Sequence, residues 1–219
     1  MPVISVSSTK GGVGKTTLVI CLAEAVAQQG GSVAVLDADP NGHVSTWYDV
    51  AKEETDTKVK VIPGVTEANI HDHIDAVVDD YSIVLIDLEG AASQIVTFAI
   101  ARSDLVLIPT RSSAMDLQEV FRTHDQVRHA ERMLKRPIKA RAVFCQVPGL
   151  VNKVQSHAVS EVERRGVPCL NAQVLMRPAA YAQIHFTGVT PAHPEGDPKA
   201  RREIHSVLEE ILTIFREDA

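Results

Sequence analysis

Aromatic residues and cysteines are scarce in this chain. Only 4% of its 219 residues are Phe, Trp or Tyr, and its three cysteines, Cys21, Cys145 and Cys169, are far apart and show no Cys-x-x-Cys spacing. An odd number of scattered cysteines argues against a disulfide framework and against a zinc site, and fits reduced thiols in a cytosolic protein. We therefore expect neither kind of cross-link to hold the fold together.

Long apolar runs and a signal peptide are also missing. No apolar run approaches the roughly 20 residues that span a bilayer. The first ten residues, MPVISVSSTK, lead straight into a strand pattern instead of a charged and then apolar leader. We expect a cytoplasmic protein. Its formal net charge is −6, so any contact with nucleic acid requires a local basic patch.

The composition is that of an ordinary globular protein, in which short β-branched runs alternate with helical patterns. Apolar residues make up 45% and charged residues 23% of the chain. Buried strands are predicted over Val3–Ser7, Val33–Leu36, Ile83–Ile86, Leu105–Ile108 and Ala142–Cys145. The segments between them have apolar residues three and four apart, which predicts helices. This alternation predicts one α/β domain over residues 1–219, a doubly wound, mostly parallel sheet with helices on both faces.

The strongest motif is STKGGVGKTT, residues 8–17, which follows the first predicted strand and begins a helix. The strict phosphate-loop pattern, Gly-x-x-x-x-Gly-Lys-[Ser/Thr], would need a glycine where the chain has Thr9. The strand–loop–helix context still turns backbone N–H groups toward phosphate oxygens. Lys15 would reach the β- and γ-phosphates of a nucleotide, and the Thr16 hydroxyl would bind Mg²⁺. The alternative is a glycine-rich turn followed by an incidental lysine.

The same stretch holds a second lysine, Lys10, and through KGGVGKTT it resembles the deviant Walker A motif of the ParA/MinD group of P-loop ATPases. The resemblance extends over nearly the whole chain. It implies that two protomers face each other with ATP between them, and that Lys10 is the signature lysine that reaches the partner's nucleotide. Lys10 would then neutralise developing charge, as an arginine finger does. An exposed lysine that contacts nothing is the alternative.

By this resemblance the whole loop binds ATP. Its expected nucleotide-binding residues are Gly11, Gly12, Val13, Gly14, Lys15, Thr16 and Thr17.

Two aspartates lie at the end of the second predicted strand, in VAVLDADPNG, residues 33–42. Carboxylates in this position lie beside the ligand site of a parallel sheet. The stretch resembles switch I of the family, which implies that Asp39 orients the attacking water and that Asp37 supports the Mg²⁺ shell. Asn41 stands where the family usually has Gln. Taken alone, residues 39–42 are simply a favourable turn.

A further acidic residue ends the run IVLID, residues 83–87, which has the form of a Walker B strand. Asp87 would hold Mg²⁺ directly or through water, although a strand-end aspartate alone is weak evidence. We expect the neighbouring Glu89 to be solvated, with a contact to the switch or to the partner subunit as the alternative. We expect Gly90 to keep the flexible turn that a γ-phosphate-sensing loop needs.

Later segments carry weaker parts of the resemblance. They imply that Cys145 and Pro148 lie where the family contacts adenine, and that an Arg-x-x-x-Tyr segment within residues 175–184 precedes the closing helix. Asp116 and Glu119 are predicted to form the capping box of another helix.

The resemblance implies an ATP-dependent dimeric switch, for which three destinations are open. In the first, the dimer binds nucleoid DNA non-specifically, and a ParB-like or cargo-adaptor protein stimulates its slow ATP hydrolysis to position a plasmid, a chromosome region or a protein assembly. A predicted basic helix over residues 122–141, with seven Lys and Arg against two acidic residues, supports this destination. Such a charge run is otherwise a solvated helix face.

The second destination is a membrane, as in the MinD branch. The C-terminal segment SVLEEILTIFREDA carries Glu209, Glu210, Glu217 and Asp218, which anionic lipids would repel, so we expect it to dock on the core. The third is ATP-coupled metal or redox chemistry, which would need cysteine pairs that the chain lacks. We expect a short, stand-alone ParA-like protein without an N-terminal helix-turn-helix domain.

Overall fold

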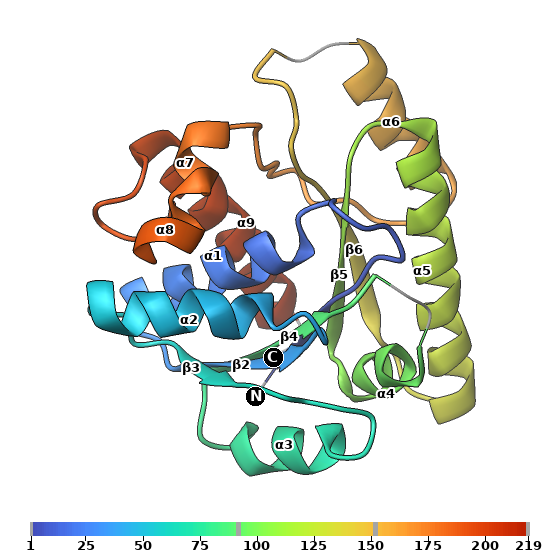
Figure 1. Ribbon diagram of the computed structural model, residues 1–219. Helices are drawn as coiled ribbons and strands as arrows, with labels where there is room; N and C mark the ends of the chain where they lie inside the picture. The colour runs from blue at the N-terminus through green and yellow to red at the C-terminus, as the bar shows by residue number, and fades with distance from the viewer. Residues whose placement is uncertain (1, 91–92, 151–152, 218–219) are drawn as a thin grey trace.

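Six parallel strands form a twisted sheet at the centre of the molecule (Figure 1). The computed structural model describes residues 2–90, 93–150 and 153–217. The strands follow the order β3-β2-β4-β1-β5-β6, and every neighbouring pair is parallel. Their bounds are β1 (Val3–Val6), β2 (Val33–Ala38), β3 (Lys60–Ile62), β4 (Ile83–Leu88), β5 (Leu105–Thr110) and β6 (Lys139–Phe144).

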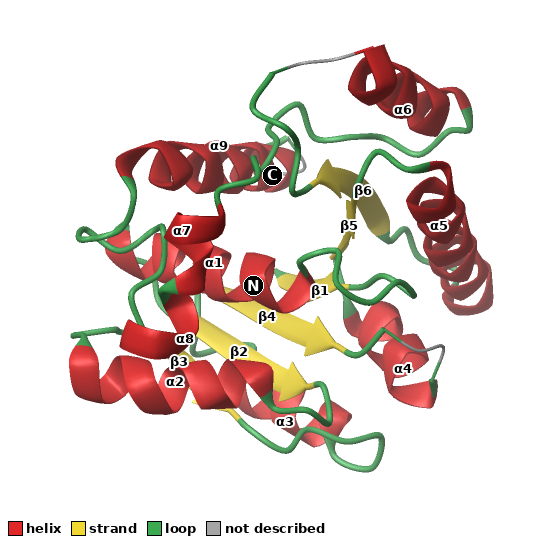
Figure 2. Cartoon of the chain, turned by 45° about the horizontal axis from the view of Figure 1, so that its top comes forward, coloured by secondary structure: helices red, strands yellow, loops and turns green. Residues whose placement is uncertain are grey.

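Helices cover both faces of this sheet (Figure 2). Their bounds are α1 (Lys15–Gln28), α2 (His43–Glu54), α3 (Ile70–Val77), α4 (Gln94–Arg102), α5 (Ala114–Leu134), α6 (Lys153–Arg164), α7 (Pro178–Ala182), α8 (Ile184–Thr187) and α9 (Pro198–Arg216). The core on one face comes from α1, α2 and α9, and the core on the other from α3, α4, α5 and α6. No helix in the described ranges is long and apolar enough to cross a bilayer.

The predicted fold class is confirmed, and the five predicted strands are present with small shifts at their ends. The sheet is parallel throughout rather than mostly parallel. The sequence did not predict β3, because it is only three residues long and Val61 is its one fully buried side chain. Asp37 and Asp87 are the second-to-last residues of β2 and β4, so they lie within these strands rather than beyond their ends.

The closing helix α9 docks on the sheet as the sequence predicts. Its buried side chains recur three and four residues apart, and they are Ala200, Ile204, Val207, Leu208, Ile211 and Ile214. Asp197 caps its first turn by accepting hydrogen bonds from the backbone of Lys199 and Ala200. The acidic residues Glu209 and Glu217 are exposed, and Asp218 lies outside the described residues.

The segment after α8 is held against α2 by the only tryptophan of the sequence. Trp47 is fully buried, and its indole N–H donates to the Gly188 carbonyl at 2.9 Å. Gly188 has a φ of 70°, and a Cβ there would lie 2.5 Å from the Cα of Ala51. Only glycine therefore allows this close approach.

Two predictions about α5 are wrong. Ser113, not Asp116, caps the helix: its hydroxyl accepts from the Asp116 backbone N–H at 3.2 Å, so the N-cap lies three residues earlier than predicted. The basic helix also does not reach residue 141, because Lys135 ends α5 with a left-handed φ of 53° and Pro137 follows it. Lys139 and Arg141 belong to β6.

Candidate functional site

The glycine-rich loop joins β1 to α1 at the carboxyl edge of the sheet. Gly12 and Gly14 have φ values of 73° and 99°, a region that favours glycine, and Gly14 forms the N-cap of α1. The helix therefore begins at Lys15, with the free N–H groups of its first turn directed at the loop. This is the arrangement that binds phosphate groups in other proteins. Because these glycines are required by the backbone, the loop could be predicted from sequence.

The two predicted Mg²⁺ aspartates lie side by side. Asp37 and Asp87 are directly paired in register between β2 and β4, and both are buried. The Thr16 hydroxyl, at the start of α1, donates to Asp87 Oδ2 at 2.8 Å. Among the residues that the structure describes, Asp37 Oδ1 and Asp87 Oδ1 have no hydrogen-bond partner, and both atoms are buried. A hard cation bound by oxygen ligands would satisfy these two atoms, so the residues present fit Mg²⁺.

Burial and charge set the protonation of this cluster. The pKa of Asp87 is raised to about 7, chiefly by burial; the charges of Asp37 and Asp39 add to the rise, and the Thr16 hydrogen bond and the Lys15 charge oppose it. Burial lowers the pKa of Lys15, against the charges of Asp87, Asp39 and Glu89. The cluster thus holds excess negative charge that a cation would relieve.

The switch I aspartates make different contacts. The second oxygen of Asp37 accepts from the backbone N–H and the hydroxyl of Ser45, at 2.8 and 2.5 Å, which ties β2 to the first turn of α2. Asp39 is half-buried and accepts from the backbone and side-chain N–H groups of Asn41, both at 2.8 Å. The turn over residues 39–42 therefore forms as its sequence favours, with Asp39 at the edge of the acidic cluster.

The segment after β4 lies against the glycine-rich loop. A Cβ on Gly90 would be 3.3 Å from Lys15 Nζ and 3.6 Å from the Lys10 carbonyl carbon. Glu89 is half-buried rather than solvated, and its charge acts on Lys15. A movement of Glu89 or Gly90 would therefore change the surroundings of both Lys10 and Lys15.

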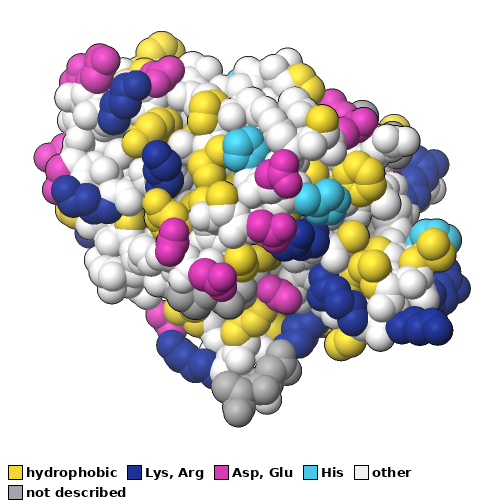
Figure 3. All heavy atoms as spheres, turned by 90° about the horizontal axis from the view of Figure 1, so that it is seen from below, with side chains coloured by type: hydrophobic (Ala, Val, Ile, Leu, Met, Phe, Trp, Pro, Cys, Tyr) yellow, Lys and Arg dark blue, Asp and Glu magenta, His cyan; other side chains and the backbone are white. Residues whose placement is uncertain are grey.

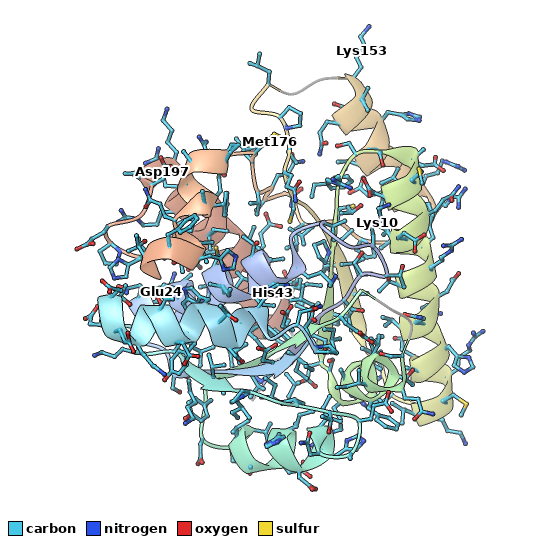
Figure 4. All side chains as sticks on the ribbon, in the orientation of Figure 1. Lys10, Glu24, His43, Lys153, Met176 and Asp197 are labelled. Atoms are coloured by element: carbon cyan, nitrogen blue, oxygen red, sulfur yellow. The ribbon has the colours of Figure 1, made fainter. Side chains whose placement is uncertain are left out.

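A cavity of about 320 Å³ opens beside the loop. It is mostly apolar and is lined by Thr17, Cys145, Gln146, Met176, Arg177 and Tyr181, among others. Figure 4 shows Met176 at the top of this region. Of the two residues expected at the adenine, Cys145 lines this cavity, whereas Pro148 is exposed and is not among the lining residues. An apolar cavity next to a phosphate loop suits a nucleobase and its sugar.

Gln146 is a residue of this cavity that the sequence did not point to. Its backbone has a left-handed φ of 55°, which is uncommon for a residue that is neither Gly, Asn nor Asp. Its side-chain N–H donates to the Gly12 carbonyl at 2.9 Å, across 134 residues of sequence. Gln146 therefore joins the cavity to the loop. A single glutamine after a strand gives no pattern from which this contact could be predicted.

The cysteines do not form a reactive or metal-binding cluster. Burial raises the pKa of Cys145 to about 12 and raises that of Cys21 further, so both thiols are protonated at neutral pH. Within the described ranges, no group of three or more His, Cys, Asp and Glu side chains is arranged to hold a metal.

His71 is exposed and contacts Phe98, with ring centroids 5.2 Å apart.

Comparison with known proteins agrees with this geometry. Residues 1–193 match the family model described as VirC1 protein. Protein ParA of Rhizobium radiobacter is 32% identical over 189 residues, covering 86% of this chain and 84% of the relative. The chain belongs to the VirC1 family of ParA/MinD-type deviant Walker A ATPases. Another relative of this ATPase is the maintenance of carboxysome distribution protein A of Halothiobacillus neapolitanus, 28% identical with 95% of each chain covered.

Solved structures show the same ParA/MinD-type fold. The apo form of McdA from Cyanothece superposes with a TM-score of 0.80 at 17% identity, covering 97% of this chain and 99% of the other. An ATP complex of a McdA variant gives the same TM-score at 16% identity, covering 97% of this chain and 96% of the other. MinD of Pyrococcus furiosus gives 0.76 at 19% identity, with 97% and 99% covered.

Lys10, the lysine that the resemblance identifies as the signature lysine, lies at the bend of the loop. Figure 4 shows Lys10 between α1 and α5. The Lys10 carbonyl accepts a long, 3.4 Å hydrogen bond from Lys15 Nζ, and its backbone N–H donates to the Ser8 hydroxyl at 3.4 Å. In the part of the chain that the structure describes, no partner contacts the Lys10 ammonium group. The ammonium group is therefore available to a ligand or to another molecule.

The basic residues of the ATPase are less concentrated than its sequence suggests. Arg122 and Arg128 pair with Glu119 and Glu131 on α5 at 2.5 and 3.0 Å. Arg136 donates to two backbone carbonyls, those of Ala101 and Ser103, at 2.6 and 2.9 Å. These three side chains are thus engaged within the protein.

Two other cations remain on that surface. Arg132 and Lys135 are exposed and make no ion pair with the described residues. Figure 3 shows Lys and Arg side chains gathered toward the edge of this face where α5 lies, with acidic side chains nearer its middle.

Proposed function

We propose that this ParA-family ATPase is an ATP-dependent dimeric switch that partitions or positions a cargo. ATP would bind with its phosphates on residues 11–17 and its base in the cavity beside Cys145. Lys10 of each protomer would reach the nucleotide of the other. Hydrolysis would dissolve the dimer, and a ParB-like or cargo-adaptor protein would accelerate it. The single observation that carries the proposal is that the Lys10 ammonium group contacts no partner among the described residues, on a loop whose second lysine is buried near acidic side chains.

Mg²⁺ is the cofactor that the acidic cluster fits best. Thr16, Asp37 and Asp87 would hold it, directly or through water, and the ion would neutralise phosphate charge. Lys15 lies beside Asp87 and would bind the phosphates that the ion also contacts. Asp39, at the edge of the cluster, would orient water for attack once a nucleotide is bound. These residues are proposed to act together as one hydrolytic site.

Such a switch would operate on DNA, which it would bind without regard to base sequence. Arg132 and Lys135 are exposed near the end of α5, and Lys199 and Arg202 are exposed on α9. Side chains of this kind bind backbone phosphates without reading the base sequence. We accordingly propose that the protein works in the cytoplasm, associated with the nucleoid, and that residues 1–219 act as one ATPase domain.

The two other destinations have less support. The last helix α9 directs its apolar side chains into the core, where they cannot enter a bilayer. A redox or metal-transfer role would use reactive thiols, but Cys21 and Cys145 are buried. The relatives named ParA and maintenance of carboxysome distribution protein A also favour a role in partition or positioning.

Mass measurement in solution with and without nucleotide tests the proposal. We expect the wild-type protein to be monomeric without ATP and dimeric with Mg²⁺ and a non-hydrolysable ATP analogue. Lys10→Ala should bind a fluorescent ATP analogue within about threefold of the wild type and yet stay monomeric, whereas Lys15→Ala should lose nucleotide binding. A Lys10→Ala protein that dimerises and hydrolyses ATP like the wild type would refute the proposed switch.

A further inference from the structure

The residue before the signature lysine is tied to a distant helix. The Thr9 hydroxyl donates a short hydrogen bond to Glu119 Oε2 on α5, across 110 residues of sequence. The other carboxylate oxygen, Oε1, accepts from Arg122 Nη1 at 2.5 Å. The Glu119 side chain is only 17% exposed. Both of its oxygens are therefore occupied, and the carboxylate has a fixed position.

The helix that carries Glu119 is itself well anchored. Leu117 and Val120, on either side of it in sequence, are buried in the core between α5 and the sheet. Ser113 caps the N-terminus of α5, six residues before Glu119. A hydrogen bond to Glu119 thus attaches the loop to a rigid element rather than to another loop.

Beyond Thr9, two exposed glycines follow Lys10, and side chains hold the loop backbone at further places. Gly11 and Gly12 are exposed, and a Cβ on either would meet no atom within 4 Å. Lys15 Nζ donates to the Lys10 carbonyl at 3.4 Å, and the Gln146 side chain donates to the Gly12 carbonyl at 2.9 Å. Lys10 and Gly11 therefore lie between the Thr9–Glu119 and Gly12–Gln146 contacts, and the Lys10 carbonyl between them accepts one long hydrogen bond from Lys15. Gly11 has a large range of backbone conformations because it is a glycine.

We propose that Glu119 is a positioning residue for the signature lysine. By holding Thr9, it fixes the backbone from which the Lys10 side chain extends toward the partner's nucleotide. The inference rests on the proposed trans role of Lys10. A displacement of about 1 Å in a catalytic group can cost about a hundredfold in rate, so a hydrogen bond that restricts this backbone matters beyond its contribution to stability.

Two substitutions remove the bond from opposite ends. Thr9→Val keeps the shape of the side chain but removes the donor, and Glu119→Ala removes the acceptor. We expect both to bind a fluorescent ATP analogue within about threefold of the wild type. Both should weaken ATP-induced dimerisation, and slow steady-state hydrolysis, by about tenfold or more, the range for a hydrogen bond to a charged group. Glu119→Gln keeps an acceptor oxygen and should restore dimerisation to within about threefold of the wild type.

The control is Glu161→Ala on α6. Like Glu119, Glu161 pairs with an arginine three residues on, Arg164, at 2.9 Å, but it has no contact with the loop. It should dimerise as the wild type does. The double variant Thr9→Val/Glu119→Ala should be no worse than either single variant, because all three lack the same bond.

The results separate this inference from the proposed switch. If Lys10→Ala abolishes the dimer but Thr9→Val and Glu119→Ala dimerise normally, Glu119 does not position Lys10 and the switch stands. Equal loss in Glu119→Gln and Glu119→Ala, or additive losses in the double variant, also overturns the inference. A wild-type protein that stays monomeric with ATP overturns both proposals.

Discussion

Asp37 and Asp87 are register partners on adjacent parallel strands, and each keeps one buried carboxylate oxygen that no described residue hydrogen-bonds. Two such carboxylates repel each other and are costly to ionise away from water. The second oxygen of each is satisfied, by Ser45 in one case and by Thr16 in the other. The fold therefore tolerates an unfavourable arrangement at the place where a divalent cation would make it favourable.

The metal-free protein should lose stability as Asp87 ionises. Its folded-state pKa is raised to about 7, whereas an unfolded aspartate titrates near pH 4. Between these values the folded state binds more protons than the unfolded state, so the free energy of unfolding falls as pH rises through this window. We expect Asp87→Asn, in chelator, to match the wild type near pH 4 and to melt several degrees higher at pH 8.

Thermal unfolding of both proteins across this pH range checks the prediction. Asp80→Asn, at an exposed position, controls for the loss of one negative charge. Adding Mg²⁺ with ATP should reverse the order at pH 8, since only the wild type gains a metal ligand. A pH profile that is the same in Asp87→Asn and the wild type would contradict the assignment.

Asp39→Ala should slow hydrolysis while leaving nucleotide binding intact. If Asp39 orients the attacking water, its loss should reduce turnover by about a hundredfold and let the ATP-bound dimer accumulate. Asn41→Ala is the matched control, because it removes a side-chain hydrogen bond to Asp39 without removing the carboxylate. Single-turnover kinetics and mass measurement give the two readouts. Equal turnover in Asp39→Ala and the wild type would leave residues 39–42 as a turn alone.

Arg132→Ala/Lys135→Ala should weaken binding to any DNA duplex in the presence of ATP. The loss should not depend on base sequence, and the slope of log affinity against log salt should fall by about one to two. Lys58→Ala/Lys60→Ala removes two exposed cations at the other edge of the sheet and controls for net charge. Arg136 is left intact because it supports the backbone after α4. A wild-type protein that binds no duplex with ATP would remove DNA from the proposed function.

Gly188→Ala should destabilise the protein by about 3 kcal/mol or more, because the new Cβ would overlap Ala51 in a left-handed backbone. Gly166→Ala provides the comparison. Gly166 also has a positive φ, of 80°, but a Cβ there meets no atom within 4 Å, so the cost should stay near 1 kcal/mol. Denaturant unfolding measures both. Similar losses in the two variants would show that steric overlap at Ala51 is relieved by movement of the segment after α8.

The parts of the site that could be predicted are those that depend on neighbours in sequence. Gly14, Lys15 and Thr16 follow one another, and Asp87 follows four apolar residues, so each could be placed on its strand or helix in advance. Contacts between distant segments left no such pattern. One hydrogen bond joins Thr9 to Glu119, and another joins Gly12 to Gln146. A single hydrogen bond between distant residues produces no repeating pattern of apolar or charged residues from which it could be predicted.

Charge counting over-predicted the basic surface for a related reason. Composition shows seven cations in residues 122–141, but it does not show that Lys135 ends the helix or that the Arg136 guanidinium binds backbone carbonyls. The position of a helix end depends on one backbone angle, and the partner of a long side chain depends on packing. Both are properties of the folded chain.

The buried indole of Trp47 gives this chain a built-in optical reporter. It is the sole tryptophan, it lies one turn into α2 directly after the switch I turn, and its N–H is bonded to a carbonyl of the segment that covers it. If Asp37 or Asp39 moved and α2 tilted with them, the hydrogen bond from Trp47 to Gly188 would stretch. The fluorescence emission of Trp47 would then change. If α2 moves during the proposed nucleotide cycle, the emission of unlabelled protein would report that movement in real time, without an attached dye.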